Sequence, residues 1–320
     1  MLDAEYSEAL NRIIILTYQN EVRLFDPVTF DAPAIPLPTN ATSLSLSPDG
    51  LSAAVAYIGF VSILDLRAQT ISVTIETNTS SGDIVLGAAG YAYLLPDPGR
   101  HALVDMHSIE IATGVVHGDD ANGSDDAGSK LKLHPGGKVI YGITQYLTPE
   151  SLESFDISQG VSGAHGRSLD DTHPDPCGDL WLSRDGSSIF TGCGNAFNAL
   201  PGMPGDMFYR GSFETVPNSM PTGAPYQSLA LDEEKGHIYA LPGPQYLNTP
   251  ESTARGSALD TFDYQTLKLV TTQQIPCLAE DGGKARSNGQ LVFAPSGGSH
   301  VYALIITDSL SSGLATFDRE

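Results

Sequence analysis

A two-residue motif, a hydrophobic residue followed by an acid, recurs along the whole chain. Its copies usually close a short apolar run, and they are Phe25-Asp26, Leu64-Asp65, Val104-Asp105, Phe155-Asp156, Phe213-Glu214, Phe262-Asp263 and Phe317-Asp318. A polar or glycine-rich turn precedes each copy after the first, as in Ser47-Pro48-Asp49-Gly50 and His134-Pro135-Gly136-Gly137. Turns of this composition join the strands of β-hairpins. The motif therefore predicts a chain made of repeated small β-sheets.

The apolar runs beside these turns predict the strands of each repeat. Residues 43–47 and 53–57, for example, flank one turn, and both runs have the length and alternation of strands. Four antiparallel strands in a repeat of about 46 residues are typical of a β-propeller. We therefore predict an all-β fold, a seven-bladed β-propeller of four-stranded blades, as a single domain over residues 1–320. The predicted blades are 3–38, 41–77, 82–116, 129–162, 177–216, 226–274 and 288–320.

The last copy of the motif lies two residues before the end of the sequence, at Phe317-Asp318. The seventh blade therefore has no residues left for a fourth strand of its own. Either this blade has three strands or the chain is a piece of a longer protein. We favour the second interpretation, which predicts further domains in a longer chain.

Two segments resemble the repeat signatures of YVTN-type and WD-repeat-like propellers of bacterial exported proteins. They are Leu44-Ser45-Leu46-Ser47-Pro48-Asp49-Gly50 and Leu24-Phe25-Asp26-Pro27-Val28-Thr29. The Trp-Asp pair of the WD-repeat group is replaced here by Phe-Asp, Leu-Asp or Val-Asp. The resemblance implies the propeller fold over nearly the whole chain. It also implies an alternative function, because lactonase-type propellers of this kind have a catalytic site at the mouth of the central channel.

The charge of the chain restricts its partners. The sequence has 38 Asp and Glu but 16 Lys and Arg, which gives a formal net charge of -22. A field of this sign repels nucleic acids and anionic lipid surfaces. No apolar run approaches the roughly 18 residues that a membrane-spanning helix requires. We therefore expect neither a nucleic-acid partner nor membrane insertion, and the composition and repeats favour a secreted or cell-surface protein.

The predicted loops are long at one end of the blades. Insertions between the second and third strands are predicted at 143–151, 193–206 and 241–256, and long connections between blades at 117–129, 162–176 and 276–288. Both kinds of connection emerge at the same end of an antiparallel blade. A rigid scaffold that presents long loops at one end commonly binds a ligand there. Drift in loop length without function is the alternative interpretation.

Candidate binding residues occur in these loops. Aromatic rings and polar groups suit a carbohydrate or protein surface, and the candidates are Tyr146, Asp171, His173, Asn195, Phe197, Asp206, Tyr209, Tyr246 and Arg255. We predict a non-enzymatic recognition or scaffold propeller without a catalytic residue. The alternative is a lactonase- or lyase-type enzyme, which would require Asp171, His173, Asp206 or Arg255 to converge at the channel. Simple packing of the loops would also explain the aromatic residues.

The segment 117–126 contains four carboxylates, Asp119, Asp120, Asp125 and Asp126. Carboxylate oxygens are the ligands that calcium prefers, although the spacing does not match an EF-hand loop. We therefore consider calcium as the one candidate cofactor. A solvated acidic loop is the alternative.

The three cysteines are Cys177, Cys193 and Cys277. Counting outward from the turn at 184–187 places Cys177 opposite Cys193 on neighbouring strands. This placement predicts a cross-strand disulfide at the base of the 194–206 loop. Two buried thiols are the alternative, and Cys277 is expected to stay unpaired.

Overall fold

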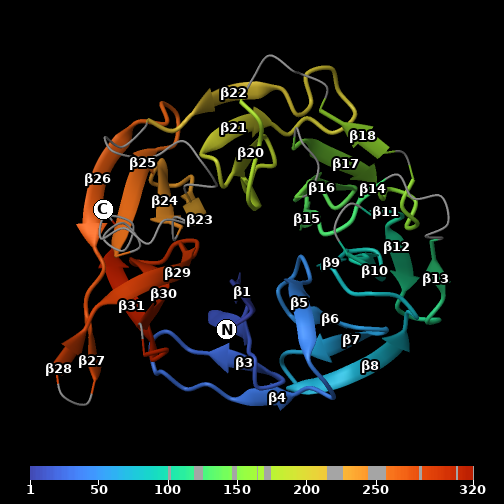
Figure 1. The fold of residues 1–320 in the computed structure, drawn as a ribbon, viewed down its shortest axis with the longest axis horizontal. Coiled ribbons are helices and arrows are strands. Elements are labelled where there is room, and N and C mark those ends of the chain that lie inside the picture. Colours follow the sequence, from blue (N-terminus) through green and yellow to red (C-terminus); the bar gives the residue numbers. More distant parts are fainter. Residues whose placement is uncertain are drawn as a thin grey trace. The chain divides into compact units, whose positions relative to one another are not determined.

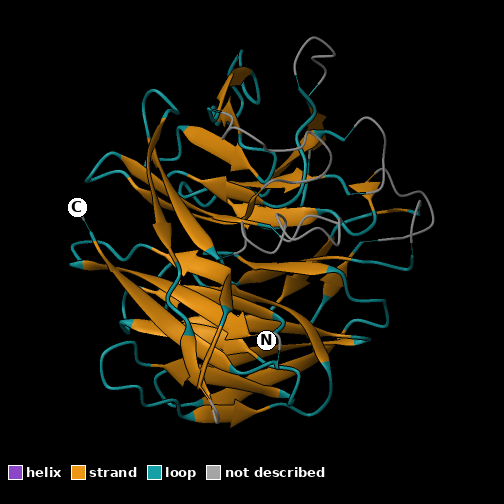
Figure 2. Cartoon of the chain, turned by 60° about the vertical axis from the view of Figure 1, so that its left-hand side comes forward, coloured by secondary structure: helices purple, strands orange, loops and turns teal. Residues whose placement is uncertain are grey.

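The computed structural model describes residues 1–99, 102–118, 125–145, 150–163, 165–168, 174–214, 226–243, 257–280, 283–307 and 309–319. These residues form strands, turns and loops, and no helix occurs among them (Figure 2). The chain divides into two compact units, Met1–Leu169 and Asp170–Glu320, which we call unit 1 and unit 2.

Unit 1 contains four antiparallel sheets of four strands each (Figure 1). The first is β1 (Asp3–Ser7), β2 (Arg12–Leu16), β3 (Glu21–Phe25) and β4 (Ala34–Pro36), and the second is β5 (Ala41–Leu46), β6 (Ser52–Tyr57), β7 (Phe60–Asp65) and β8 (Thr70–Glu76). The third is β9 (Asp83–Leu86), β10 (Tyr91–Leu95), β12 (His107–Glu110) and β13 (Val116–His117). The fourth is β15 (Lys130–Leu133), β16 (Val139–Ile143), β17 (Leu152–Asp156) and β18 (His165–Arg167). Strands β11 (Leu103–Val104) and β14 (Asp125–Asp126) form a separate two-stranded sheet.

Unit 2 continues the pattern with three sheets. The fifth is β19 (Leu180–Leu182), β20 (Ser188–Thr191), β21 (Asn195–Asn198) and β22 (Tyr209–Ser212), and the sixth is β23 (Tyr226–Asp232), β24 (His237–Pro242), β25 (Ala258–Asp263) and β26 (Leu269–Gln274). The seventh has three strands, β29 (Ser287–Phe293), β30 (His300–Thr307) and β31 (Ser312–Asp318). A hairpin of β27 (Leu278–Glu280) and β28 (Gly283–Ala285) precedes it. The predicted all-β fold with seven antiparallel blades, the last of them incomplete, is confirmed.

Each sheet has two ends that matter for the site. At one end a tight turn joins the first strand to the second, and we call this the hairpin end. At the other end the second strand passes to the third, and the chain continues to the next sheet. We call this the connection end.

The turn at 47–50 shows why these sequences form hairpins. Gly50 has a φ of 68°, which a residue with a side chain rarely adopts. Its N–H donates to the Ser47 carbonyl over 2.8 Å, and the Ser47 hydroxyl accepts the Ser52 N–H over 3.0 Å. Ser183 and Gly186 form the same turn in the fifth sheet, where the Gly186 N–H donates to the Ser183 carbonyl over 3.0 Å.

The acid of the repeated motif caps the turn that follows the third strand. The Asp26 carboxylate accepts the N–H groups of Val28 and Thr29 over 2.7 and 3.1 Å. The Asp156 carboxylate accepts the Ser158 N–H over 2.8 Å, and this bond holds the pKa of Asp156 below its usual value. The motif therefore serves to form a turn, because the carboxylate of its acid accepts backbone N–H groups that a backbone carbonyl would otherwise accept.

Two of the predicted copies are not at the ends of third strands. In the third sheet the third strand is β12, whose last residue Glu110 pairs with Tyr91, whereas Val104 belongs to β11 of the small sheet. In the fifth sheet the third strand is β21, which ends at Asn198, and Phe213-Glu214 follows the fourth strand. Asn198 does not repeat the acceptor bond of the motif, since its Nδ2 donates to the Gly205 carbonyl over 3.2 Å.

This shift of strands also corrects one predicted insertion. Residues 193–206 were expected to separate the second and third strands of the fifth blade. Only 192–194 separate β20 from β21, and the long segment 199–208 instead joins β21 to β22. The insertion of this blade is therefore at its hairpin end, opposite to the predicted end.

Hydrophobic side chains fill the space between successive sheets. One cluster combines Ile14 and Val22 of the first sheet with Val55 and Tyr57 of the second, and all four are fully buried. Burying one such aliphatic side chain contributes about 1.5–3 kcal/mol. The first strands of neighbouring sheets also contact one another, β1 with β5, β5 with β9 and β9 with β15. The side chains of these first strands are therefore gathered in one place.

Candidate functional site

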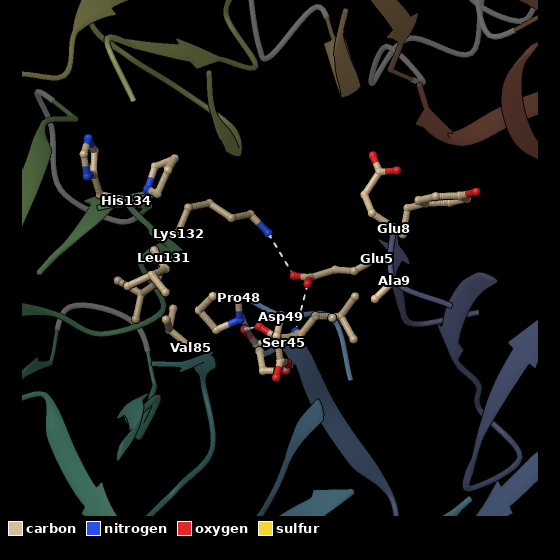
Figure 3. A pocket seen from close by; sticks show the side chains of 16 residues that line it. Glu5, Glu8, Ala9, Ser45, Pro48, Asp49, Val85, Leu131, Lys132 and His134 are labelled. Carbon is tan, nitrogen blue, oxygen red and sulfur yellow. Dashed lines mark hydrogen bonds and ion pairs between the residues drawn. The ribbon is translucent and has the colours of Figure 1, made fainter. Parts of the chain in front are cut away.

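A cavity of about 390 Å³ opens at the hairpin end of unit 1. First strands β1, β5 and β15 and the turns that follow them supply most of its lining (Figure 3). The polar side chains of the lining include Glu5, Glu8, Asp49, Lys132 and His134. The volume is in the range of ligand-binding pockets in proteins. We take this cavity as the candidate functional site.

Glu5 occupies a fixed position in the cavity. Its Oε2 accepts the Leu46 N–H over 2.9 Å, and its Oε1 lies 3.7 Å from the Lys132 Nζ. Figure 3 shows the Lys132 side chain extending towards Glu5 from the opposite wall. Both side chains line the cavity, and the Glu5 side chain keeps 26% of its surface exposed and that of Lys132 34%.

Other first-strand side chains make the same kind of bond to the next sheet. Asp3 accepts the Leu44 N–H over 3.2 Å, and Asp83 accepts the Leu131 N–H over 2.9 Å. The bonds from Leu86 N–H to Ser45 Oγ, 3.1 Å, and from Val292 N–H to Ser228 Oγ, 3.0 Å, repeat the arrangement with hydroxyls. These polar side chains therefore stabilise the contact between adjacent sheets, and in unit 1 several of them are carboxylates.

The carboxylates are poorly solvated. Burial raises the pKa of the Asp3 carboxyl to about 6, and the nearby Glu5 and Asp83 carboxylates add to the shift. Lys132 and the Leu44 N–H oppose it without cancelling it. Burial also raises the pKa of Glu5. Among the described residues whose charges act on Asp3, two are carboxylates and one is a lysine, so a further cation would be attracted to the region.

We expect Asp3→Asn to increase the free energy of unfolding by about 1–2 kcal/mol at pH near 8. The Asp3 pKa of about 6 in the folded chain exceeds the ordinary aspartate value of 3.8, so ionisation costs more in the folded state. This cost is absent below the unfolded pKa, grows as the pH rises between the two values, and is complete above the folded pKa. Asparagine keeps an oxygen that can accept the Leu44 N–H.

Urea unfolding at pH near 8 and near 4 measures the effect, which should be present at the higher pH and nearly vanish at the lower. Asp31→Asn is the control, because Asp31 is exposed and the change in net charge is the same. Equal stabilisation by both variants, or no dependence on pH, would show that burial of Asp3 is not the cause.

Four of the predicted binding residues lie in or beside the fifth sheet. Asn195 and Phe197 are buried in β21, and the Phe197 ring contacts the Tyr209 ring edge-on with 5.8 Å between centroids. Asn195 Nδ2 donates to the Asp175 carbonyl over 3.1 Å, and the Asp206 carboxylate accepts the Leu200 N–H over 2.8 Å. All of them make contacts within their own sheet and its loops. A role in binding stays a prediction.

The other predicted binding residues lie outside the described residues. They are Tyr146, Asp171, His173, Tyr246 and Arg255. The convergence that the enzymatic alternative requires is therefore not tested.

The predicted calcium site is described only in part. Asp119 and Asp120 lie outside the described residues, whereas Asp125 and Asp126 form β14. The Asp125 carboxylate is buried and accepts the Met106 N–H over 3.1 Å. Within the described part of the chain no three His, Cys, Asp or Glu side chains are grouped to hold a metal ion. Calcium binding stays a prediction.

Cys177 and Cys193 form a disulfide, with 5.2 Å between their Cα atoms, as predicted. The Cys193 N–H also donates to the Cys177 carbonyl over 3.2 Å. The disulfide joins the residues before β19 to those after β20, at the connection end. Because the long loop of this sheet follows β21, the disulfide does not close its base as expected. Cys277 is free and exposed.

Solved structures support the fold class. The chain resembles hydrazine synthase of Kuenenia stuttgartiensis with a TM-score of 0.67 at 12% identity, over 99% of this chain and 95% of that one. It resembles the β-propeller domain of Cps50 (Swd1) from Myceliophteria thermophila with a TM-score of 0.69 at 12% identity, over 99% and 96% of the two chains. A chain in the crystal structure of a mitotic checkpoint complex matches with a TM-score of 0.64 at 15% identity, over 99% and 86%.

These likenesses and the seven sheets define the class of the protein, a seven-bladed β-propeller. At such low identity they show the fold alone. No model of a known protein family matches the chain, and no curated protein matches it in sequence. Among the residues that the structure describes, no helical segment is long and apolar enough to cross a membrane.

The sequence analysis missed the cavity and its carboxylates. It placed the ligand at the connection end, whereas this cavity lies at the hairpin end of unit 1. One usable signal was present, because Asp3, Glu5 and Asp83 interrupt first strands whose other residues are partly apolar. A carboxylate on a partly buried first strand requires a hydrogen-bond donor or a cation beside it, so such an acid marks a position where the structure fixes a negative charge.

Proposed function

We propose that this chain is a non-enzymatic protein-interaction propeller whose cavity in unit 1 binds a lysine or arginine side chain of a partner protein. The observation that carries the proposal is the Glu5 carboxylate. It is held by the Leu46 N–H, faces the cavity and, among the described residues, lies near the Asp3 and Asp83 carboxylates and the Lys132 ammonium.

The chemistry of the cavity suits a cation. A carboxylate already fixed by a backbone bond loses little freedom when a guanidinium or ammonium group binds it, and charge-assisted hydrogen bonds are the stronger kind. The net charge of -22 also attracts basic partners over a distance and accelerates their encounter. The structures of similar fold include a chain in a mitotic checkpoint complex.

The test uses N-acetyl-arginine amide as the probe. We expect it to shift the amide NMR signal of Leu46, which bonds to Glu5, and to bind about tenfold more weakly to Glu5→Gln. Binding should also weaken as salt is added, because part of the attraction is long-range.

Glu76→Gln is the matched control. It removes the same charge from an exposed position on β8 that does not line the cavity. An equal loss of affinity in both variants would mean that only the net charge matters. A Leu46 signal that the probe does not shift in the parent chain would contradict the proposal.

We also propose that the protein is exported or displayed at a cell surface. The Cys177–Cys193 disulfide supports this, since such bonds persist mainly in oxidising compartments. Fractionation of the native host, with detection of the oxidised chain outside the cytosol, tests the proposal. A reduced chain recovered from the cytosol would contradict it.

A further inference from the structure

Among the described residues, one edge of the seventh sheet has no partner strand. Strand β31 pairs with β30 along its whole length, from Ser312 opposite Ile306 to Asp318 opposite His300. No further strand pairs with its other side among the described residues. In each of the six other sheets a fourth strand occupies this position.

The hydrogen bonds identify the backbone groups on this edge. The Thr307 N–H donates to the Ser311 carbonyl over 2.9 Å, and the Arg319 N–H donates to the Ser299 carbonyl over 3.0 Å. In an antiparallel pair such bonds fall on every second residue. Gly313, Ala315 and Phe317 therefore direct their N–H and C=O groups to β30. Those of Ser312, Leu314, Thr316 and Asp318 face the open edge.

The edge has one of the features that usually prevent pairing, the charge of the exposed Asp318 at its end, but it lacks lysine, proline and bulges. Proteins protect exposed edges with lysine, proline, bulges or very short strands. Strand β31 has seven residues, Ser-Gly-Leu-Ala-Thr-Phe-Asp, without lysine or proline, and its register with β30 contains no bulge. Ser312, Thr316 and Asp318 are exposed, whereas the middle of the equivalent strand β25 is buried. The edge is therefore a template for another strand.

We propose that β31 binds an extended segment of a partner protein as the fourth strand of the seventh sheet. The fourth strands β8 and β26 indicate the chemistry of this segment, since their residues alternate between exposed and half-buried along most of their length. The segment alternates β-branched with polar residues and carries lysine or arginine. The charge of -22 favours a basic segment over a second copy of this chain, which would bring like charge to the edge.

The edge and the cavity are separate surfaces. The cavity belongs to unit 1 and binds through side chains, whereas β31 belongs to unit 2 and binds through its backbone. Glu5→Gln therefore tests the cavity alone. Failure at one surface leaves the proposal for the other intact.

The experiment selects short random peptides, displayed on phage, on the purified chain and maps the bound peptide by hydrogen exchange. The decisive variant is Thr316→Pro, because the Thr316 N–H faces the open edge and its loss removes no bond to β30. Thr316→Val is the matched control, since it keeps the N–H and a branched side chain. Thermal unfolding confirms that both variants are folded.

We expect enriched peptides to be basic, poor in glycine and proline, and alternating in pattern. They should slow exchange at the Leu314 and Thr316 amides, bind about tenfold more weakly to Thr316→Pro, and bind normally to Thr316→Val. If the selection yields no peptide, or if the peptides bind Thr316→Pro as well as the parent, the proposal is wrong. Slow exchange of the Leu314 and Thr316 amides in the chain without peptide would also contradict the proposal. If the chain is then a dimer, the edge pairs with a second copy.

Discussion

Replacing Arg319 by methionine is expected to lower the free energy of unfolding by about 3–5 kcal/mol. Arg319 follows β31, and its guanidinium pairs with the Asp232 carboxylate at the end of β23. The Arg319 side chain is 2% exposed and that of Asp232 0%. Methionine fills a similar volume but leaves the carboxylate buried without its counter-charge.

The guanidinium also satisfies backbone groups of the seventh sheet. Its Nη1 donates to the carbonyls of Pro295 and Gly298 over 2.8 and 2.9 Å. Burial alone would raise the pKa of Asp232, but the hydrogen bonds and charge of Arg319 outweigh it, and the pKa is lowered. The pair therefore stabilises the fold above the unfolded pKa of Asp, about 4. This contribution is lost as the pH falls through the lower folded value.

Urea unfolding of Arg319→Met at neutral pH measures the loss. Glu234→Gln is the control, because Glu234 also contacts Arg319, over 3.1 Å, but its side chain is 57% exposed. It should cost less than about 1 kcal/mol. Combining Arg319→Met with Asp232→Leu should recover much of the stability, since an apolar pair can replace a buried ion pair. A loss below about 1 kcal/mol in the single variant would show that the pair contributes little.

Removal of the disulfide, by Cys177→Ser together with Cys193→Ser, is expected to destabilise unit 2 by about 3 kcal/mol. The sequence separation of 16 residues sets this figure, because the cross-link restricts that length of chain in the unfolded state. Changing both cysteines avoids leaving a reactive thiol beside the hydrogen bond between Cys193 and Cys177.

Denaturant unfolding of the oxidised parent and the double variant measures the difference. Cys277→Ser should be neutral, because that thiol is exposed and free. Reducing the parent chain should reproduce the loss seen in the double variant. A double variant as stable as the parent would mean that the strands around β19 and β20 hold the same geometry without the cross-link.

The fold was predictable because its determinants are local. A serine hydroxyl and a left-handed glycine form the same turn at Ser47 and Gly50 and at Ser183 and Gly186, and Asp26 caps a turn formed by its own neighbours. The third and fifth repeats were misread for the same reason. Val104-Asp105 and Phe213-Glu214 imitate the motif, whereas the third strands end at Glu110 and Asn198.

The candidate site was less accessible to sequence analysis because its residues meet only in the folded sheets. Glu5 and Lys132 are far apart in sequence, and no spacing rule links the first strands that carry them. The aromatic and amide residues that attracted attention, such as Asn195 and Phe197, are buried in β21. Aromatic and amide side chains suit ligand recognition, but the same side chains also pack within a sheet. Only their burial in the folded structure distinguishes the two roles.

The hydrogen bonds between neighbouring first strands restrict which residue types can occupy these positions. In each of them the donor is a backbone N–H, which every residue except proline provides. The acceptor can be a glutamate, an aspartate or a serine, as Glu5, Asp83 and Ser45 show. At these junctions the bond therefore constrains the acceptor to an oxygen-bearing side chain and leaves the identity of both residues otherwise open.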